Sequence, residues 1–292
     1  MRTNYPALYE AKKSTVQDCL DVIQSGNVVA FAASCNSPVA ILSQMHTIAD
    51  RVTDVKCIKG HEGVFPFITM PGMDGHINTG SFFLGKDLTN GMAVGNATFI
   101  PADMCDYSTF TQGHFPCNVF VAAATPMDEN GNLQVGLSMM FEDAAYACAD
   151  KILLEVNPRL PRIRGGLEIH ISDVTRLVEV DYPIYTVPDQ EPTPEEVQVA
   201  KNVRSLLRDG DCVQIGIGSL PNAIANELFD LNDLGLHTEM ATNTIGRLIE
   251  AGVITGEAKT IDRGLHVGTF VRGDEELYHT LSTDPNVRFR PA

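Results

Sequence analysis

The chain has 292 residues and a formal net charge of −16, with 44% hydrophobic and 20% charged residues. A chain of this length forms about two domains of ~100 to 200 residues each, and this composition is ordinary for a protein that folds. Nucleic-acid binding rests on clustered Lys and Arg, so the acidic balance excludes nucleic acid and anionic membrane surfaces as partners. An anionic small ligand stays open if backbone amides or a few basic side chains hold it locally.

The N-terminal residues 1–13 contain no apolar core of signal-peptide length. The longest apolar runs, such as VVAFAA at 28–33, are too short to span a bilayer. Seven cysteines are scattered without a CxxC pair, which indicates free buried thiols in a reducing compartment and no disulfide framework. We therefore expect a cytoplasmic protein that does not enter a membrane.

Apolar, β-branched runs alternate with segments of helical period in the first part of the chain. The expected elements are a helix at 15–23, a strand at 28–33, a helix at 39–52, and strands at 55–58 and 118–123, followed by a helix at 141–149 and a strand at 152–156. This alternation predicts a largely parallel sheet covered by helices. The stretch 183–196 is rich in Pro and acid and lacks periodicity, so it is predicted to be a linker after a first domain at 1–182.

Residues 197–292 contain a second α/β pattern. We expect a helix from 197, strands at 212–215, 236–240 and 265–270, helices at 221–228, 244–251 and 275–281, and an extended end. The same order of helix, Gly turn, strand, small-residue loop and Pro-initiated helix occurs at 15–42 and 197–228, which fits both an internal repeat and any two βαβ units.

The predicted fold class is therefore α/β, with two related open domains and largely parallel sheets. The second domain, 197–292, is small for a doubly wound domain, so we expect it to be incomplete or completed by another chain.

The segment QIGIGSLP at 214–221 runs from a strand through a Gly-x-Gly loop into a helix with Pro in its first turn. In open α/β sheets such loops lie at the carboxyl ends of strands, where glycines let N–H groups approach an oxyanion or phosphate. A plain strand-to-helix turn gives the same pattern, and a single GxG favours that simpler reading. The GxGxxG of dinucleotide folds and the GK[ST] of phosphate-binding loops do not occur in this segment.

The segment LGLHTEMATN at 234–243 places Glu239 at the end of the next strand, and hence at the same sheet edge as the Gly-x-Gly loop. Position alone favours a solvated acid before a helix, where the helix dipole would stabilise the charge by about 0.3–1 kcal/mol. A functional carboxylate is the alternative.

Other segments give weaker signals. The pair His61-Glu62 is not followed by the second His of HExxH, and no His or Cys pair has ligand spacing, so we expect no protein metal site and treat the histidines as structural. Residues 60–76 are rich in Gly and Pro, which predicts a long loop. The loop would either lie near a functional site or have no functional role. The turn signal Glu129-Asn130-Gly131 predicts a hairpin whose acids form the turn.

Eight segments, in this order along the chain, match the pattern of one known protein family: GNATFIP, ATPMDENGNLQVG, KILLEVNPRLPRIRGG, EIHISDV, DGDCVQIGIGSLPNAI, DLGLHTEM, GVITGEAKT and FVRGDEELYHTL. Over nearly the whole chain this set resembles the acetyl-CoA hydrolase/transferase family, in particular its 4-hydroxybutyrate and butyryl-CoA:acetate CoA-transferases. The Q-x-G-I-G loop and the H-T-E-M segment are its most specific parts.

The resemblance implies a role for each residue of these two segments. Glu239 would be the covalent nucleophile, and the loop against the acyl-CoA would consist of Gln214, Gly216, Ile217 and Gly218. Relatives commonly continue after H-T-E-M with Ser-Asp-Gly, whereas this chain has Thr242-Asn243-Thr244. We therefore expect Thr242 and Asn243 at the substrate or CoA site, with a different loop shape or substrate preference.

The implied activity is transfer of CoA between an acyl-CoA and a small acid such as 4-hydroxybutyrate, butyrate or acetate, through a glutamyl anhydride and a glutamyl-CoA thioester. The CoA thioester is then a substrate, and no permanently bound cofactor is expected. A homo-oligomer, in particular a homodimer, is expected. Family members continue into a Gly-Gly-Gln-x-Asp-Phe segment that this sequence lacks, so a missing segment or second chain is a further requirement. Acyl-CoA hydrolysis and a non-catalytic CoA-binding or assembly role stay open as alternatives.

Overall fold

The computed structural model describes residues 4–60 and 65–292, which divide into two compact units. The N-terminal unit comprises Met1–Leu160, Leu167–Pro183 and Pro291–Ala292, and the C-terminal unit comprises Pro161–Gly166 and Ile184–Arg290. The predicted linker contains no helix or strand before Pro194. The domain limits 1–182 and 197–292 themselves stay a prediction.

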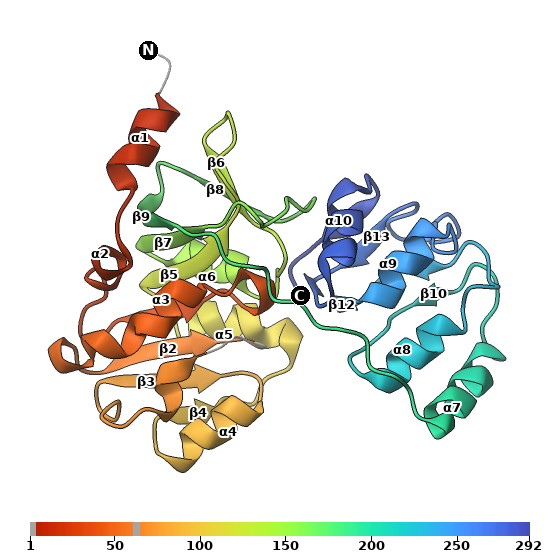
Figure 1. The fold of residues 1–292 in the computed structure, drawn as a ribbon, viewed down its shortest axis with the longest axis horizontal. Coiled ribbons are helices and arrows are strands. Elements are labelled where there is room, and N and C mark those ends of the chain that lie inside the picture. The colour runs from red at the N-terminus through yellow and green to blue at the C-terminus, as the bar shows by residue number, and fades with distance from the viewer. Residues whose placement is uncertain (1–3, 61–64) are drawn as a thin grey trace. The chain divides into compact units, whose positions relative to one another are not determined.

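The N-terminal unit is built on a seven-stranded, fully parallel sheet in the order β4-β3-β2-β1-β5-β7-β9 (Figure 1). The strands are β1 (Val28–Phe31), β2 (Val55–Lys59), β3 (Ile77–Ser81), β4 (Ala97–Phe99), β5 (Val119–Ala124), β7 (Lys151–Val156) and β9 (Val174–Glu179). From β1 the chain moves outward to β4 and then returns to the other side of β1 through β5, which is the doubly wound order. The predicted fold class is confirmed.

The α-helices of this unit within the described residues are α1 (Tyr5–Lys12) and α2 (Val16–Leu20), which precede β1, and α3 (Val39–Gln44), α4 (Lys86–Ala93), α5 (Tyr107–Gly113) and α6 (Glu142–Cys148), which lie between strands. The unit also has 3-10 helices η1 (Ser34–Asn36), η2 (Met45–Arg51), η3 (Pro66–Thr69) and η4 (Met104–Asp106). The helix predicted at 39–52 was wrong in part, because its second half is the 3-10 helix η2. Residues His61 and Glu62 lie outside the described residues.

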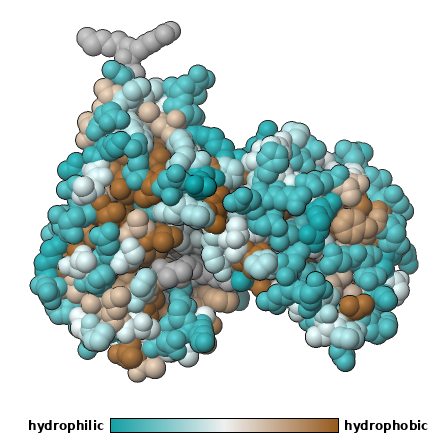
Figure 2. All heavy atoms as spheres, in the orientation of Figure 1, coloured by the Kyte–Doolittle hydropathy of each residue, from teal (hydrophilic) through white to brown (hydrophobic). Residues whose placement is uncertain are grey.

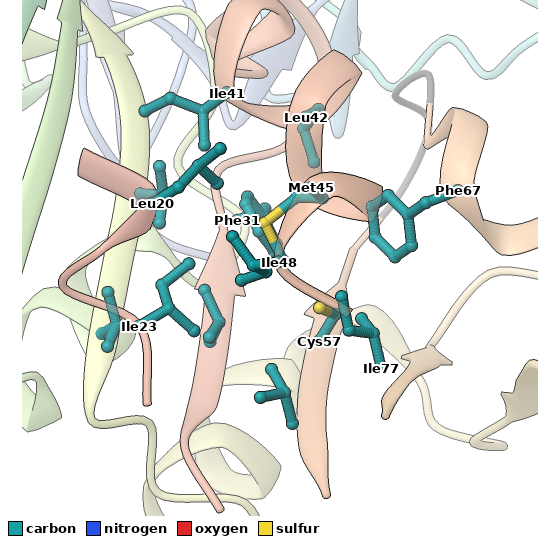
Figure 3. Packing of buried hydrophobic residues seen from close by; sticks show 14 of the residues in the cluster. Leu20, Ile23, Phe31, Ile41, Leu42, Met45, Ile48, Cys57, Phe67 and Ile77 are labelled. Atoms are coloured by element: carbon teal, nitrogen blue, oxygen red, sulfur yellow. The ribbon is translucent and has the colours of Figure 1, made fainter. Parts of the chain in front are cut away.

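The hydrophobic core of this unit lies where α2, α3 and η2 pack on one face of the sheet (Figure 3). Leu20 of α2, Phe31 of β1 and Met45 of η2 are fully buried there. Residues two apart in a strand share a face, so Val29 joins Phe31 on this face. Each fully buried aliphatic or aromatic side chain contributes about 1.5–3 kcal/mol relative to exposure, which holds the sheet rigid under its loops.

An antiparallel pair leaves the main sheet after β5, formed by β6 (Asn132–Val135) and β8 (Leu167–His170). The predicted turn is present before β6, with Gly131 at φ +85°. The Asp128 carboxylate accepts hydrogen bonds from the backbone N–H groups of Asn130 and Asn132. The acid is therefore a turn former, as predicted.

The C-terminal unit repeats short parallel strands and helices. Its helices are α7 (Pro194–Arg204), α8 (Ser219–Asn226), α9 (Asn243–Glu250) and α10 (Glu275–Thr283). Its strands are β10 (Cys212–Val213), β11 (Gly235–Leu236), β12 (Met240–Ala241), β13 (His266–Gly268), β14 (Phe270–Val271) and β15 (Val287–Phe289). The parallel pairs are β10 with β11, β12 with β14, and β13 with β15. Two predicted strands are interrupted: 236–240 at His237 to Glu239, and 265–270 at Thr269.

Hydrophilic residues cover most of the C-terminal unit on the face drawn in Figure 2.

All seven cysteines are free, and four are buried as predicted, whereas Cys105 and Cys212 are exposed. Among the described residues, no helix combines the length and apolarity needed to cross a bilayer.

Candidate active site

The Gly-x-Gly loop and Glu239 lie next to each other because of the parallel pairing of β10 with β11. The register pairs Cys212 with Gly235 and Val213 with Leu236, and the backbone N–H of His237 donates to Val213 O at 3.1 Å. Continuing this register beyond the strands brings the loop that begins at Gln214 alongside the segment that ends at Glu239. The sequence prediction placed these two segments at the same sheet edge, and the pairing supports that placement.

The Thr238 side chain joins these two segments directly. Its Oγ1 accepts a hydrogen bond from Ile215 N–H at 3.2 Å and lies 3.1 Å from Ile215 O and 3.2 Å from Met240 O, either of which can accept its proton. Thr238 is only 4% exposed. The hydroxyl therefore fixes the start of the loop against the backbone on both sides of Glu239.

The strand that carries Glu239 is interrupted from His237 to Glu239, where an isolated bridge pairs His237 with Val267. β11 ends before this interruption and β12 begins after it, while the neighbouring strand breaks between β13 and β14 at Thr269. The Glu239 carbonyl accepts hydrogen bonds from the N–H groups of Thr269 and Phe270, both at 3.1 Å. Two donors on one carbonyl mark a local irregularity of the kind that turns a side chain out of a regular ladder.

Alternating burial shows which way the segment faces. Leu236, Thr238 and Met240 are buried, whereas His237 is exposed and Glu239 is partly exposed. His237 and Glu239 are thus the more open residues of the segment between β11 and β12. Glu239 is therefore neither buried in the core nor fully exposed.

The loop itself combines exposed positions with one required glycine. Gln214, Ile217 and Gly218 are exposed, Gly216 is half-buried, and the Ile217 side chain is 41% exposed although it is aliphatic. Gly218 has φ +124° and precedes the first residue of α8, a conformation that residues with a Cβ rarely adopt. The loop therefore presents an apolar side chain and backbone groups beside the N-terminus of α8.

Thr242 and Asn243, also predicted at the site, have different surroundings. Both are buried at the start of α9. The Asn243 amide donates to Val187 O and to Asp189 Oδ1 and accepts from Asp274 N–H, so it connects three segments of the protein. The Thr242 hydroxyl is buried and has no hydrogen-bond partner among the described residues. Thr242 directly follows β12, while the Asn243 side chain bonds to the segments around Val187, Asp189 and Asp274.

The local electrostatics favour an anion near Glu239. The loop ends at the N-terminus of α8, and β12 leads into the N-terminus of α9. Each N-terminus carries a partial positive charge of roughly half an elementary charge. Within residues 4–60 and 65–292, no group of three or more His, Cys, Asp or Glu side chains is arranged to hold a metal ion.

Together the fold and the candidate site describe an α/β protein in which a glutamate lies beside a glycine loop at the carboxyl ends of paired parallel strands. Residues 1–194 match the model of the acetyl-CoA hydrolase/transferase N-terminal domain, so the chain belongs to the acetyl-CoA hydrolase/transferase family. The predicted family is confirmed.

Known relatives agree with this assignment. A probable butyrate:acetyl-CoA coenzyme A-transferase of Syntrophomonas wolfei is 31% identical over 96% of this chain and 64% of its own length. The crystal structure of RipA from Yersinia pestis matches with a TM-score of 0.93 and 28% identity, over 99% of this chain and 70% of that one. A 4-hydroxybutyrate CoA-transferase from Porphyromonas gingivalis matches with a TM-score of 0.81 and 27% identity, over 99% and 69%.

The chain spans about two thirds of the length of the curated relatives that it matches, from 64% to 66% for the first three.

The sequence patterns gave no role to Thr238, whose hydroxyl joins the two segments in the structure. The available signal was a hydroxyl-bearing residue at a buried position of an otherwise apolar strand, directly before the candidate carboxylate. Its partner Ile215 lies 23 residues away in the sequence, and the spacing of the two segments does not indicate this hydrogen bond.

Proposed function

We propose that this protein is a CoA-transferase that moves CoA between an acyl-CoA and a small carboxylic acid, with Glu239 as the covalent nucleophile. The observation that carries the proposal is the partly exposed Glu239, whose segment is joined to the loop 214–218 by the hydrogen bonds of Thr238. Family membership and the names of the relatives support the reaction class.

The reaction begins when the Glu239 carboxylate attacks the thioester carbonyl of the acyl-CoA. Collapse of the tetrahedral adduct breaks the C–S bond, forms a mixed anhydride and releases CoA thiolate. The thiolate then attacks the glutamyl carbonyl of the anhydride, which gives an enzyme-CoA thioester and the free first acid. A second carboxylate attacks this thioester and reverses the two steps, so that a new acyl-CoA leaves and Glu239 is regenerated.

A carboxylate is the suitable nucleophile because each intermediate must stay activated. Both an anhydride and a thioester can pass an acyl group to the next nucleophile, whereas a serine would form an ordinary ester, which is a poor donor to a carboxylate. The glutamate thus conserves the energy of the thioester through the exchange.

The neighbouring loop has the chemistry to stabilise the adducts. Every addition step places negative charge on a carbonyl oxygen, and backbone N–H groups aimed at that charge supply several kcal/mol of transition-state stabilisation. We assign this role to the backbone from Gly216 to Gly218 at the start of α8. Gln214 and Ile217 would contact the CoA thioester, and Thr242 the acid, with Asn243 holding the start of α9.

The competing activity is hydrolysis of the acyl-CoA, in which water attacks the anhydride formed on Glu239. The two reactions are separated by incubating the full-length protein with butyryl-CoA and isotope-labelled acetate. Label in acetyl-CoA is the expected result. Free CoA and butyrate without labelled acetyl-CoA would establish hydrolysis, and binding of CoA without turnover would establish a CoA-binding protein.

The nucleophile is tested by trapping. Incubation with acyl-CoA, borohydride reduction of the enzyme-CoA thioester and peptide mass mapping should find the modification on Glu239. Glu239→Gln should lower kcat by roughly 10³-fold or more. Glu257→Gln is the matched control, because Glu257 is an exposed glutamate of the same unit. Modification at another residue, or full activity of Glu239→Gln, would disprove the assignment.

The oligomeric state is a separate part of the proposal. We expect a homodimer, which light scattering of the full-length protein measures directly. A monomer with full transferase activity would disprove the homodimer and leave the proposed chemistry unchanged.

A further inference from the structure

The structure assigns to Thr238 a positioning role in the proposed reaction: its hydroxyl sets the distance between the Glu239 carboxylate and the loop 214–218. This inference rests on the proposed function, because it concerns how the proposed nucleophile is held. Thr238 is not among the residues to which the family resemblance assigned a role.

The hydroxyl replaces the backbone ladder at the point where that ladder ends. The pairing of β10 with β11 continues only to the hydrogen bond from His237 N–H to Val213 O. At the next position the N–H of Ile215 is bonded to a side chain, Thr238 Oγ1, at 3.2 Å. The loop can therefore leave the sheet while its first residue stays in register with the Glu239 strand.

One hydroxyl serves three backbone groups. It has one proton and two acceptor lone pairs, so it accepts from Ile215 N–H and donates to Ile215 O at 3.1 Å or Met240 O at 3.2 Å. These groups lie on the loop strand and on the residue directly after Glu239. Loss of the hydroxyl removes these hydrogen bonds, and no other side-chain hydrogen bond among the described residues joins Ile215 to the Glu239 segment.

The backbone of Glu239 is also held from the opposite side by the N–H groups of Thr269 and Phe270. Thr238 thus supplies the connection toward the loop, while β14 supplies the connection away from it. The reacting groups of a covalent mechanism must be held close to their productive geometry, and a misplacement of about 1 Å can lower the rate by about 10²-fold. Thr238 is buried and its hydroxyl bonds only to backbone groups, so we expect its effect to be on the rate of acyl transfer.

The experiment compares Thr238→Val with Thr238→Ser. Valine keeps the shape and removes the hydroxyl, whereas serine keeps the hydroxyl. We expect Thr238→Val to lower kcat for CoA transfer by roughly 10- to 100-fold with little change in the Kd for CoA, and Thr238→Ser to restore most of the rate. Borohydride trapping should show the same slowing of Glu239 modification.

Thr280→Val is the matched control for the loss of a buried threonine hydroxyl. Thr280 is buried in α10 of the same unit, and its hydroxyl bonds to the Glu250 carboxylate and to Glu276 O. Thr280→Val should lose thermal stability and keep kcat. If Thr238→Val does not fold, Thr238→Cys takes its place, because a thiol is a weak hydrogen-bonding group of similar size.

The outcomes separate the two proposals. A wild-type protein without transfer activity, or with activity independent of Glu239, overturns the proposed function and this inference with it. A Glu239-dependent enzyme in which the hydroxyl-free variant has the wild-type kcat overturns the role of Thr238 alone. An equal loss in the valine and serine variants also overturns it, because the effect would then follow packing and not the hydroxyl.

Discussion

The side-chain Oδ1 of Asn243 accepts a 2.9 Å hydrogen bond from the backbone N–H of Asp274, which joins the first turn of α9 to the residue that caps α10. Asn243 also donates to Asp189 Oδ1 at 3.1 Å, on the segment of the C-terminal unit that precedes α7. A residue first considered for substrate contact is thereby also a connection between three segments.

Replacement of Asn243 by alanine should therefore destabilise the C-terminal unit. The buried amide loses its bonds and the N–H of Asp274 loses its acceptor, which costs about 1–3 kcal/mol. Urea unfolding of Asn243→Ala measures this, with Asn226→Ala on the exposed side of α8 as the control. Unchanged stability together with a large rise in KM would mean instead that Asn243 acts mainly on the substrate.

Gly165 is a second position where the C-terminal unit depends on one residue. It has φ +91°, and a Cβ there would lie 2.0 Å from the backbone oxygen of Phe289 in β15. Gly165→Ala should destabilise the unit by more than the ~1 kcal/mol expected for a left-handed residue alone. Gly252→Ala is the control, because Gly252 has φ +72° and no described atom within 4 Å of the added Cβ. Equal effects in thermal unfolding would show that the segment 161–166 can move away from β15.

These contacts indicate how far the sequence alone carries the structure. The strands at 55–58 and 118–123 were predicted from apolar β-branched runs, and the structure contains β2 and β5 there. The strand β3, with the sequence INTGS, was missed because it has polar residues and a glycine in its centre. Its strand conformation is set by pairing with β2 and β4, which is a tertiary effect that local propensity does not contain.

The candidate site shows the same division. The parallel-sheet rule placed Glu239 and the loop 214–218 at one edge, because carboxyl ends of parallel strands meet there. The interruption of the strand at Glu239 was not predicted, since it depends on two N–H groups of the neighbouring strand. The hydrogen bonds of Thr238 and Asn243 likewise join segments far apart in sequence, and only the folded chain defines them.

His266 makes the stability of the C-terminal unit depend on pH. The side chain is 3% exposed in β13. Burial lowers its pKa below the ordinary 6.5, Asp284 at 3.7 Å opposes that shift, and Lys259 adds to it. The unfolded chain therefore takes up a proton below about pH 6.5 that the folded chain does not yet bind. The free energy of unfolding should fall as pH drops below that value, by at most ~1.4 kcal/mol per pH unit from this group.

Urea unfolding between pH 7.5 and 5 checks this expectation. His266→Gln should have a flatter pH dependence than the wild type in this range, whatever its stability at pH 7.5. His279→Gln is the control, because His279 is an exposed histidine on α10 of the same unit. A pH dependence that is the same in all three proteins would assign the effect to other groups.

The two glycines of the loop give a test that separates folding from ligand binding. Gly218 needs to be glycine for the fold, because its φ is +124°. Gly216 has no positive φ, and no described atom lies within 4 Å of a Cβ built on it. Folding alone thus permits alanine at Gly216, and only a ligand that approaches the backbone closely would exclude it.

We therefore expect Gly216→Ala to unfold at the wild-type temperature and to lose roughly 10- to 100-fold in kcat/KM for the acyl-CoA, since one displaced oxyanion donor costs about 10²–10³-fold in other enzymes. Gly218→Ala should lose both stability and activity, because its φ of +124° and ψ of 174° lie in a region that only glycine adopts readily, and strain there costs about 1–3 kcal/mol. The measurement is thermal unfolding in parallel with transfer kinetics. A Gly216→Ala protein with wild-type kinetics would show that the loop backbone stays away from the thioester, and the developing oxyanion would then need donors from another part of the protein.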